Sequence, residues 1–362
     1  MERVLKSDTK VTTELWRLRI PLVQAIVIPG GRSFTHTHVM LALIKDSHDN
    51  CGAGYSRFFN PADVEPCIVA AQALLSRAAS LGELLDIERI EAGAPAGHRF
   101  ASHSAANALS MAAWDLAGRR RGVACADLWG RPVGRETIDC YASALFLHTP
   151  IQALAEEARG YRSRNYRHVK MRVAADLDET LSRVAAVQSV YGEPATIALE
   201  AALSWNPATT DAFLRRAPVR PLWLEDPVKY ELLAEVDPRG CVIAAGEVLD
   251  RTVDLVQLYA TGRVANIIID VQAIGGPVRF LEAARLLFAL GAKIGSHRFP
   301  HQSAHMLACL PDSMGVEAVD WSNPALEPLS DPDPAGKVPV VGPGFNTSLN
   351  RKVIDEHGER VA

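Results

Sequence analysis

The amino-acid sequence predicts an α/β protein whose larger part is a (β/α)7-8 barrel, preceded by an α+β capping domain that the C-terminal tail completes. Three observations indicate this fold. Short apolar segments alternate with amphipathic helical segments from about residue 137 onward. Several of those apolar segments end on an ionisable residue. The residues before 136 instead have strands first and helices afterwards, the order typical of an α+β domain.

The capping domain is expected to span residues 1–135. Its strands should lie within residues 10–57, where apolar runs such as 39–44 are bounded by turn-forming residues at 30–31 and 47–50. Residues 103–119 then carry small and apolar side chains at three- and four-residue spacing, which predicts a helix. We therefore expect a small antiparallel meander followed by helices.

The barrel is expected to span residues 136–322. Its strand candidates recur about every 20 to 30 residues, the spacing of successive βα units. Residues 323–362 are rich in proline and aspartate, which cannot continue a helix, so we expect this tail to pack back on the capping domain. The strand candidates are residues 139–144, 168–173, 196–200, 222–225, 242–247, 266–270, 293–297 and, more weakly, 315–318.

The composition favours small-molecule chemistry. The formal net charge of the 362 residues is −4, so the chain lacks the broad basic field that recruits nucleic acid or anionic membrane. The six cysteines form no CxxC pair, which argues against a zinc knuckle and fits reduced thiols. The first residues do not resemble a signal peptide, and there is no run of about 18 apolar residues. We expect a cytoplasmic protein without nucleic-acid or membrane partners.

Three of the predicted strands end on a glutamate: Glu200, Glu225 and Glu247. The carboxyl ends of barrel strands meet at one mouth, so these acids should be neighbours. Carboxylates brought together repel one another unless a cation neutralises them, and an all-oxygen ligand set suits Mg²⁺. The sequence therefore predicts a divalent metal site. The alternative is that one or two of these acids are solvated strand ends.

Two further strand ends, Asp270 and His297, should also be adjacent. The carboxylate could hydrogen-bond one imidazole nitrogen and leave the other facing the mouth, which is the arrangement of a general base. Lys170 and Arg172 lie two positions apart on one strand and therefore share a face. Both are expected to point inward, where they could bind a substrate carboxylate.

These residues, in this order and spacing, resemble the enolase superfamily and, within it, the mandelate racemase-like (mandelate racemase/muconate lactonizing enzyme) group. The resemblance implies that Glu225 and Glu247 are ligands of one Mg²⁺ per subunit, and that Asp270 and His297 form the catalytic dyad. It implies that Glu317 helps to hold the substrate carboxylate, and that the protein is a symmetric homo-oligomer. It rests on residues 105–118, 128–130, 224–227, 245–247, 270–272, 295–297, 303–305, 315–317 and 343–345.

Two positions depart from the pattern of that family. The family usually has an aspartate followed two residues later by asparagine, whereas this chain has Glu200-Ala201-Ala202, so the first ligand is one methylene longer. Many members carry a second lysine as the opposing base, whereas this chain has Arg172, and a guanidinium does not give up its proton near neutrality. The second departure disfavours a mechanism with two bases.

The expected chemistry is removal of a proton from the carbon next to a carboxylate, with the metal, Lys170 and Glu317 stabilising the enediolate that results. With His297 as base, dehydration of a sugar acid to a 2-keto-3-deoxy acid is the leading expectation. Two alternatives remain: a racemase or epimerase that uses Lys170 as a second base of depressed pKa, and a lactone-forming cycloisomerase. A catalytically silent barrel that only binds a ligand is a hypothesis of another class.

Substrate choice is expected to lie with two segments of the capping domain that resemble the family's lid. Residues 29–38 contain two glycines that would let the segment close over a ligand, and residues 55–59 offer aromatic walls and a cation. The two histidines of the first segment lack further ligands nearby, which favours a substrate-contact or surface role over metal binding. The predicted contacts to a small-molecule carboxylate are Arg32, His36, His38, Tyr55, Arg57 and Phe58.

Overall fold

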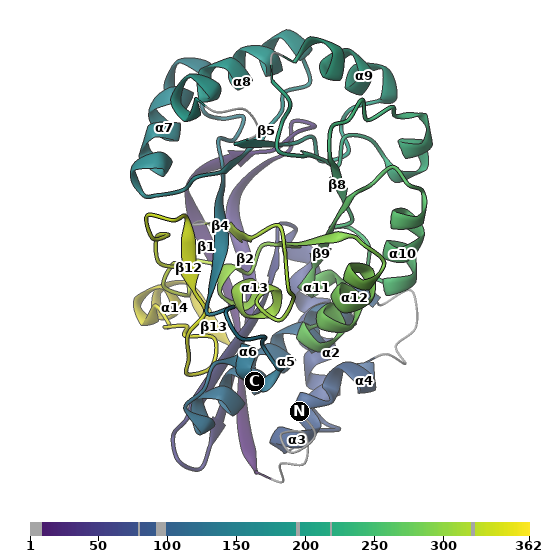
Figure 1. The fold of residues 1–362 in the computed structure, drawn as a ribbon. Helices are drawn as coiled ribbons and strands as arrows, with labels where there is room; N and C mark the ends of the chain where they lie inside the picture. The colour runs from purple at the N-terminus through teal and green to yellow at the C-terminus, as the bar shows by residue number, and fades with distance from the viewer. Residues whose placement is uncertain (1–8, 79, 92–98, 193–195, 218, 320–322) are drawn as a thin grey trace.

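The computed structural model describes residues 9–78, 80–91, 99–192, 196–217, 219–319 and 323–362 (Figure 1). The described strands form two sheets: an antiparallel sheet in the order β13-β1-β2-β3, and a parallel sheet in the order β10-β9-β8-β7-β6-β5-β4-β11. The ends of the second sheet approach each other, because the N–H of Met314 donates to the carbonyl of Ile294 at 2.8 Å. The predicted barrel with an α+β cap is confirmed.

The capping sheet is a meander whose two long strands are offset by a bulge between Pro21 and Ile26. Helix α5 packs against β3, and glycines in that strand make the approach possible. A Cβ added to Gly54 would lie 2.2 Å from the carbonyl oxygen of Ala108, so no other residue fits there without moving the helix. The elements are β1 (Val11–Val27), β2 (Ser33–Asp46), β3 (Cys51–Phe58), α2 (Val64–Leu75), α3 (Leu81–Leu85), α4 (Ile87–Glu91), α5 (Arg99–Arg121) and α6 (Cys125–Leu128).

Asp115 of α5 ties the C-terminal tail to the cap. Its carboxylate accepts hydrogen bonds from the backbone of Ala53 at 3.0 Å and of Phe345 at 2.8 Å, and pairs with Arg119 at 2.8 Å. The tail also adds β13 (Gly358–Arg360) to the edge of β1, after α14 (Arg351–His357). One segment, β12 (Lys337–Pro339), pairs instead with β4 of the barrel. The tail therefore contacts both parts, and the domain boundaries stay a prediction.

The barrel strands alternate between side chains that face the outer helices and side chains that face the interior. One interior layer consists of Tyr141, Ala198, Trp223, Ala244 and Ile268, which fill the barrel below the strand ends. The elements are β4 (Thr137–Ala144), α7 (Ile151–Ser163), β5 (Val169–Arg172), α8 (Leu177–Tyr191), β6 (Ile197–Glu200), α9 (Pro207–Arg216), β7 (Leu224–Glu225), β8 (Ile243–Ala245), α10 (Thr252–Ala260), β9 (Asn266–Asp270), α11 (Val271–Ile274), α12 (Pro277–Ala289), β10 (Lys293–His297), α13 (Pro300–Leu307) and β11 (Val316–Ala318).

Two strand ends differ from the sequence pattern: β5 ends at Arg172, one residue before the predicted end at 173, and β8 ends two residues early. The pattern predicts a strand over 242–247, but β8 ends at Ala245. Gly246 then has a φ of 129°, a backbone conformation outside the strand region, so Glu247 projects from the turn after the strand. Helix α5 is also longer than predicted, since it extends over 99–121 instead of 103–119.

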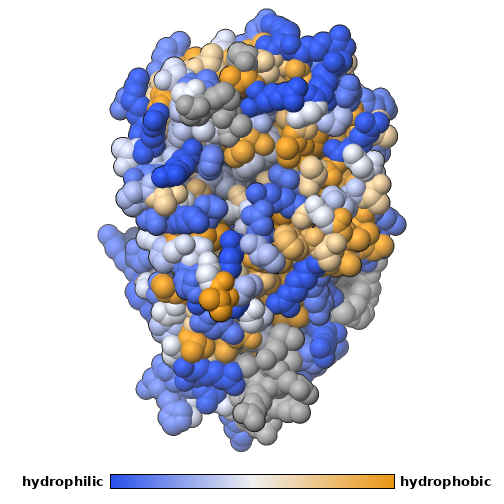
Figure 2. Space-filling view, viewed as in Figure 1, coloured by the Kyte–Doolittle hydropathy of each residue, from blue (hydrophilic) through white to orange (hydrophobic). Residues whose placement is uncertain are grey.

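The face shown in Figure 2 has hydrophilic side chains along its upper and left edges and hydrophobic ones toward its centre and right. Large apolar side chains exposed on the outer helices include Val253 of α10 and Leu286 of α12. Within the described ranges, no helix combines the length and the apolar character needed to cross a membrane.

Candidate active site

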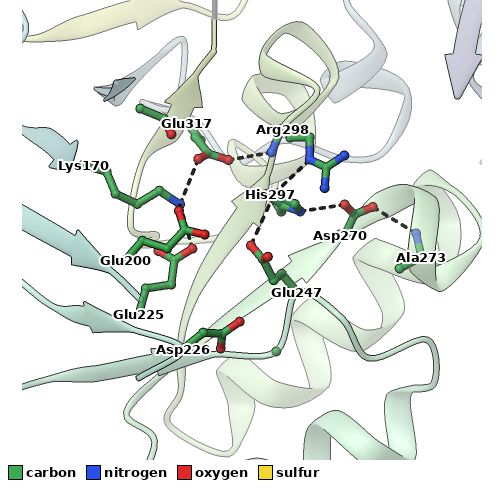
Figure 3. Close-up of polar contacts among 12 residues, drawn as sticks. Lys170, Glu200, Glu225, Asp226, Glu247, Asp270, Ala273, His297, Arg298 and Glu317 are labelled. Atoms are coloured by element: carbon green, nitrogen blue, oxygen red, sulfur yellow. Dashed lines mark hydrogen bonds and ion pairs between the residues drawn. The ribbon is translucent and has the colours of Figure 1, made fainter. Parts of the chain in front are cut away.

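The structure brings Glu200, Glu225 and Glu247 together at the barrel mouth. Glu200 ends β6, Glu225 ends β7, and Glu247 lies just after β8. One carboxylate oxygen from each residue lies within 4.8 Å of the corresponding oxygens of the other two. Figure 3 shows the three side chains converging from successive strands. Three oxygens from neighbouring strands in such a cluster are a ligand set suited to a hard divalent cation.

The electrostatics of the three acids also fit a bound cation. Burial raises the pKa of Glu225 to about 7 and that of Glu247 to about 8, and the charge of Glu200 adds to both effects. Oε2 of Glu247 is buried, accepts no hydrogen bond from any described residue, and lies 3.3 Å from Nε2 of His297. Glu200 differs: although burial opposes it, Arg172 and Lys170 hold the pKa of its carboxyl below the ordinary value. A divalent cation would relieve the repulsion that disfavours ionisation of the other two.

Lys170 contacts three carboxylates at the strand ends. Its Nζ lies 2.7 Å from Oε1 of Glu225, 2.9 Å from Oε1 of Glu317 and 3.3 Å from Oε2 of Glu200 (Figure 3). Burial alone would lower the pKa of Lys170, but these three carboxylates outweigh it and raise the pKa well above its ordinary value. In this arrangement the pKa shifts in the direction opposite to that expected of a second base. Lys170 is held as a cation, which suits charge stabilisation and not proton abstraction.

Arg172 is fixed on three sides. Its Nη1 donates to Oγ of Ser143 at 2.7 Å, and its Nη2 lies 3.1 Å from Oε2 of Glu200. Its Cζ lies 4.3 Å from the ring centroid of Phe146. A planar guanidinium held by an ion pair, a hydrogen bond and a ring cannot serve as a proton acceptor. Nevertheless Arg172 lines the cavity, where it can bind an anionic or hydroxyl group of a ligand.

Asp270 and His297 form the expected dyad across β9 and β10. Nδ1 of His297 lies 2.8 Å from Oδ2 of Asp270, and Oδ1 of Asp270 accepts the backbone N–H groups of Gln272 at 2.8 Å and Ala273 at 3.0 Å. Although Asp270 is buried, the hydrogen bond and the charge of His297 hold its pKa below the ordinary value. An ionised acceptor at Nδ1 places the proton there and leaves the lone pair of Nε2 facing the cavity.

The cavity at the barrel mouth has a volume of about 360 Å³. Glu225, Lys170 and Asp270 lie beneath it and do not line it. It lies between the strand ends and the capping domain, which contributes the first five of its lining residues. These are Ile28, Arg32, Phe34, Phe59, Asn60, Phe146, Arg172, Glu200, Ala202, Leu203, Asp226, Glu247, Val248, His297, Arg298, Glu317 and Val319.

Of the six predicted substrate contacts, the structure brings only Arg32 to this cavity. The other five lie within β2 and β3, where side chains pack on the sheet and its neighbours. For example, Tyr55 packs on Phe299 with ring centroids 4.8 Å apart, and Nε of Arg57 donates to Oγ1 of Thr37 at 2.8 Å. The capping-domain residues that do line the cavity lie between β1 and β2, at the start of β2, and just after β3. The five that do not reach the cavity are His36, His38, Tyr55, Arg57 and Phe58.

Three residues that were not among the predicted site residues make polar contacts at or beneath the cavity: Arg298, Asp226 and Trp223. The N–H of Arg298 donates to Oε2 of Glu317 at 2.7 Å, and its Nε donates to Nε2 of His297 at 2.9 Å. Asp226 lines the cavity and accepts a hydrogen bond from the hydroxyl of Tyr230 at 3.1 Å. Trp223 donates from Nε1 to Oε2 of Glu225 at 2.9 Å. Each is next or next but one to a predicted residue at a strand end, and that adjacency is the signal that could have identified it.

Comparisons with known proteins agree with this architecture. Residues 153–353 match the family model described as enolase C-terminal domain-like. The chain is 28% identical over 330 residues to 3,6-anhydro-alpha-L-galactonate cycloisomerase of Streptomyces coelicolor, an alignment that covers 85% of this chain and 87% of the relative. It is 24% identical over 336 residues to L-talarate/galactarate dehydratase of Salmonella typhimurium, with 87% of this chain and 81% of the relative covered.

Solved structures show the same fold. L-talarate dehydratase from Polaromonas sp. JS666, complexed with Mg and L-glucarate, superposes with a TM-score of 0.84 over 99% of both chains at 23% identity. A mandelate racemase/muconate lactonizing enzyme from the same organism has a TM-score of 0.85 over 98% of this chain and 99% of its own, at 24% identity. Since the family model matches more than half of the chain, the protein belongs to the enolase superfamily, in its mandelate racemase/muconate lactonizing enzyme group.

Proposed function

We propose that this protein is a metal-dependent lyase that removes the proton next to a carboxylate and dehydrates a sugar acid to a 2-keto-3-deoxy acid. One observation carries the proposal. The His297–Asp270 dyad faces the carboxylate cluster, whereas across the mouth Arg172 is immobilised by Ser143 and Glu200. A site with one base can remove a proton and then return it to a leaving hydroxyl, which is what dehydration requires.

Glu200, Glu225 and Glu247 would hold one Mg²⁺. When bound, the ion supplies positive charge that stabilises the enediolate oxygens. The raised pKa values of Glu225 and Glu247 support this assignment, since a divalent cation beside these two carboxyls would favour their ionised form. Relatives of the same fold, such as the L-talarate dehydratase, have been crystallised with Mg.

The chain's own residues divide the remaining work. Nε2 of His297 takes the proton, and Asp270 holds the imidazole in the tautomer that offers this lone pair. Lys170 adds a buried positive charge beside the cluster. This charge stabilises the negative charge that develops on the substrate carboxylate. The protonated His297 then donates to the departing β-hydroxyl group.

Glu317 acts through Lys170 in this proposal. Although burial opposes ionisation, Lys170 holds the pKa of Glu317 far below the ordinary value, so its carboxylate is an acceptor. An ionised Glu317 would repel a substrate carboxylate, but it fixes the ammonium of Lys170 at 2.9 Å and the backbone of Arg298 at 2.7 Å. We therefore assign it to positioning these two groups.

A lactone-forming cycloisomerase is the second candidate. The observation that favours it is the 24% identity over 288 residues, 72% of this chain, to D-galactarolactone cycloisomerase of Agrobacterium fabrum, and a single base can also serve that reaction. An epimerase is disfavoured, because Arg172 is held across the mouth from His297 and a guanidinium does not exchange its proton near neutrality. The proposed partner is a small-molecule carboxylate. A symmetric homo-oligomer in the cytoplasm completes the proposal, and mass photometry of the purified protein would test its assembly.

The test is incubation of the protein with Mg²⁺ and a panel of sugar acids in deuterated water, followed by NMR. A 2-keto-3-deoxy acid supports dehydration. Recovered acid that is deuterated and inverted without a keto acid would refute it in favour of an epimerase, and a lactone isomer would identify a cycloisomerase. No conversion of any acid, together with no bound metal, would indicate a silent barrel. His297→Asn should abolish conversion, while the surface variant His48→Asn should retain it.

A further inference from the structure

The side chain of Arg298 has no part in the proposed reaction, yet it lies against the base. Arg298 follows β10 directly and has a φ of 57°. Its backbone N–H is anchored by Glu317, so the backbone is held while the side chain extends along the cavity. Nε donates to Nε2 of His297 at 2.9 Å (Figure 3), and Cζ lies 5.3 Å from the ring centroid of Phe59. The guanidinium thus bridges the catalytic imidazole and the capping domain.

This contact blocks the base. Asp270 accepts a hydrogen bond from the protonated Nδ1 of His297, so Nε2 is the nitrogen left to accept a substrate proton. In the structure Nε of Arg298 already donates to Nε2, which also lies 3.3 Å from Oε2 of Glu247. A base within reach of its substrate must offer the lone pair of this nitrogen, so the side chain of Arg298 has to turn away from His297 before proton transfer.

An anionic group at the second end of a substrate could draw the side chain of Arg298 away from His297. Within the described part of the chain its guanidinium contacts His297 and Phe59 and forms no ion pair with a carboxylate, although Glu200, Asp226, Glu247 and Glu317 line the same cavity. In the proposed reaction, the substrate carboxylate next to the reacting carbon binds at the metal cluster beside Lys170. Arg298 instead extends to Phe59, which stacks on Phe34 with ring centroids 3.9 Å apart, on the side of the cavity formed by the cap. Arg32 lines the same side.

We propose that Arg298 determines specificity by binding a second anionic group at the far end of the substrate, so that the preferred substrates are dicarboxylic sugar acids. Binding of the distal carboxylate replaces the contact with His297 and frees the base. A monocarboxylic acid of the same length would leave Arg298 on His297 and would be a poor ligand. This inference rests on the proposed function, because it takes His297 as the proton acceptor.

The experiment compares matched pairs of acids that differ only at the distal carbon: galactarate with galactonate, and glucarate with gluconate. The measured quantity is kcat/KM for an acid that turns over and Kd by calorimetry with Mg²⁺ for one that does not. In the pair that binds best, the native protein should favour the diacid by at least about tenfold, the value of a charge-assisted hydrogen bond. Arg298→Gln should reduce this ratio to about one, chiefly through KM or Kd.

Two further variants separate recognition from support of the fold. Arg298→Lys keeps the charge and should retain part of the preference. Arg263→Gln, an exposed arginine on the turn before β9, should behave like the native protein. The proposal is overturned if the native protein favours the monoacid or neither member in every pair. It is also overturned if Arg298→Gln weakens both members equally, which would make Arg298 only a support for His297. Because Kd needs no turnover, failure of the proposed reaction would be seen separately.

Discussion

Replacing Asp270 by asparagine should disable the base without removing a single heavy-atom contact. Oδ1 of Asp270 accepts two backbone N–H groups, at 2.8 and 3.0 Å, where α11 begins. An amide NH₂ at that position would face two donors, each left unsatisfied at a cost of about 1–3 kcal/mol. The amide oxygen of the introduced asparagine therefore stays at the helix, and its NH₂ must point at Nδ1 of His297.

The imidazole then has to accept at Nδ1 and carry its proton on Nε2, the atom that faces the cavity. Such a tautomer cannot take a substrate proton, so kcat should fall by about 10²- to 10⁴-fold, while KM and metal affinity change little. Steady-state kinetics and metal titration would measure this. The matched control is Asp237→Asn, an exposed aspartate whose Oδ1 accepts one backbone N–H at the opposite end of the barrel. An Asp270→Asn variant with more than a tenth of the native kcat would refute the reasoning.

Three further outcomes are expected. Arg172→Lys puts an amine across the mouth from His297, so recovered substrate should contain both configurations at the α carbon by chiral chromatography; a single configuration would count against it. Burial raises the pKa of the Glu88 carboxyl to about 7. Protonation of this carboxyl therefore contributes fully to the stability of the fold below its ordinary pKa near 4.5, and this contribution is lost as the pH rises through 7. Urea unfolding should therefore show Glu88→Gln gaining stability relative to the native protein between pH 5 and 8, and a constant difference would contradict this. Gly54→Ala forces β3 from α5 and should cost about 1–3 kcal/mol, whereas an unchanged unfolding midpoint would argue against the tight packing.

The barrel could be predicted because its signal is repeated and local. Each strand is a short apolar run, and several end on an ionisable residue, so Asp270 and His297 were placed at strand ends that the structure reproduces to the residue. Convergence of the strand ends then follows from the fold alone. The end of the strand before Glu247 was predicted two residues too late, because the φ of 129° at Gly246 depends on the path of the following turn.

The lid and the charge states could not be predicted in the same way. Strand alternation says which residues share a face, but it does not say which face of the cap looks into the barrel. Arg32 and Phe59 reach the cavity because they flank strands, whereas Arg57 within β3 does not. Similarly, the raised pKa of Lys170 arises from three acids on three different strands and becomes visible only with their distances.

The central claim is that His297 removes an α proton at a metal-dependent site. The direct measurement uses a substrate deuterated at the carbon next to its carboxylate and follows the release of deuterium into water by ²H NMR. Release should require Mg²⁺, stop on addition of a chelator, and be absent in His297→Asn. Turnover with the deuteron retained on carbon, or release that persists in His297→Asn, would contradict the account.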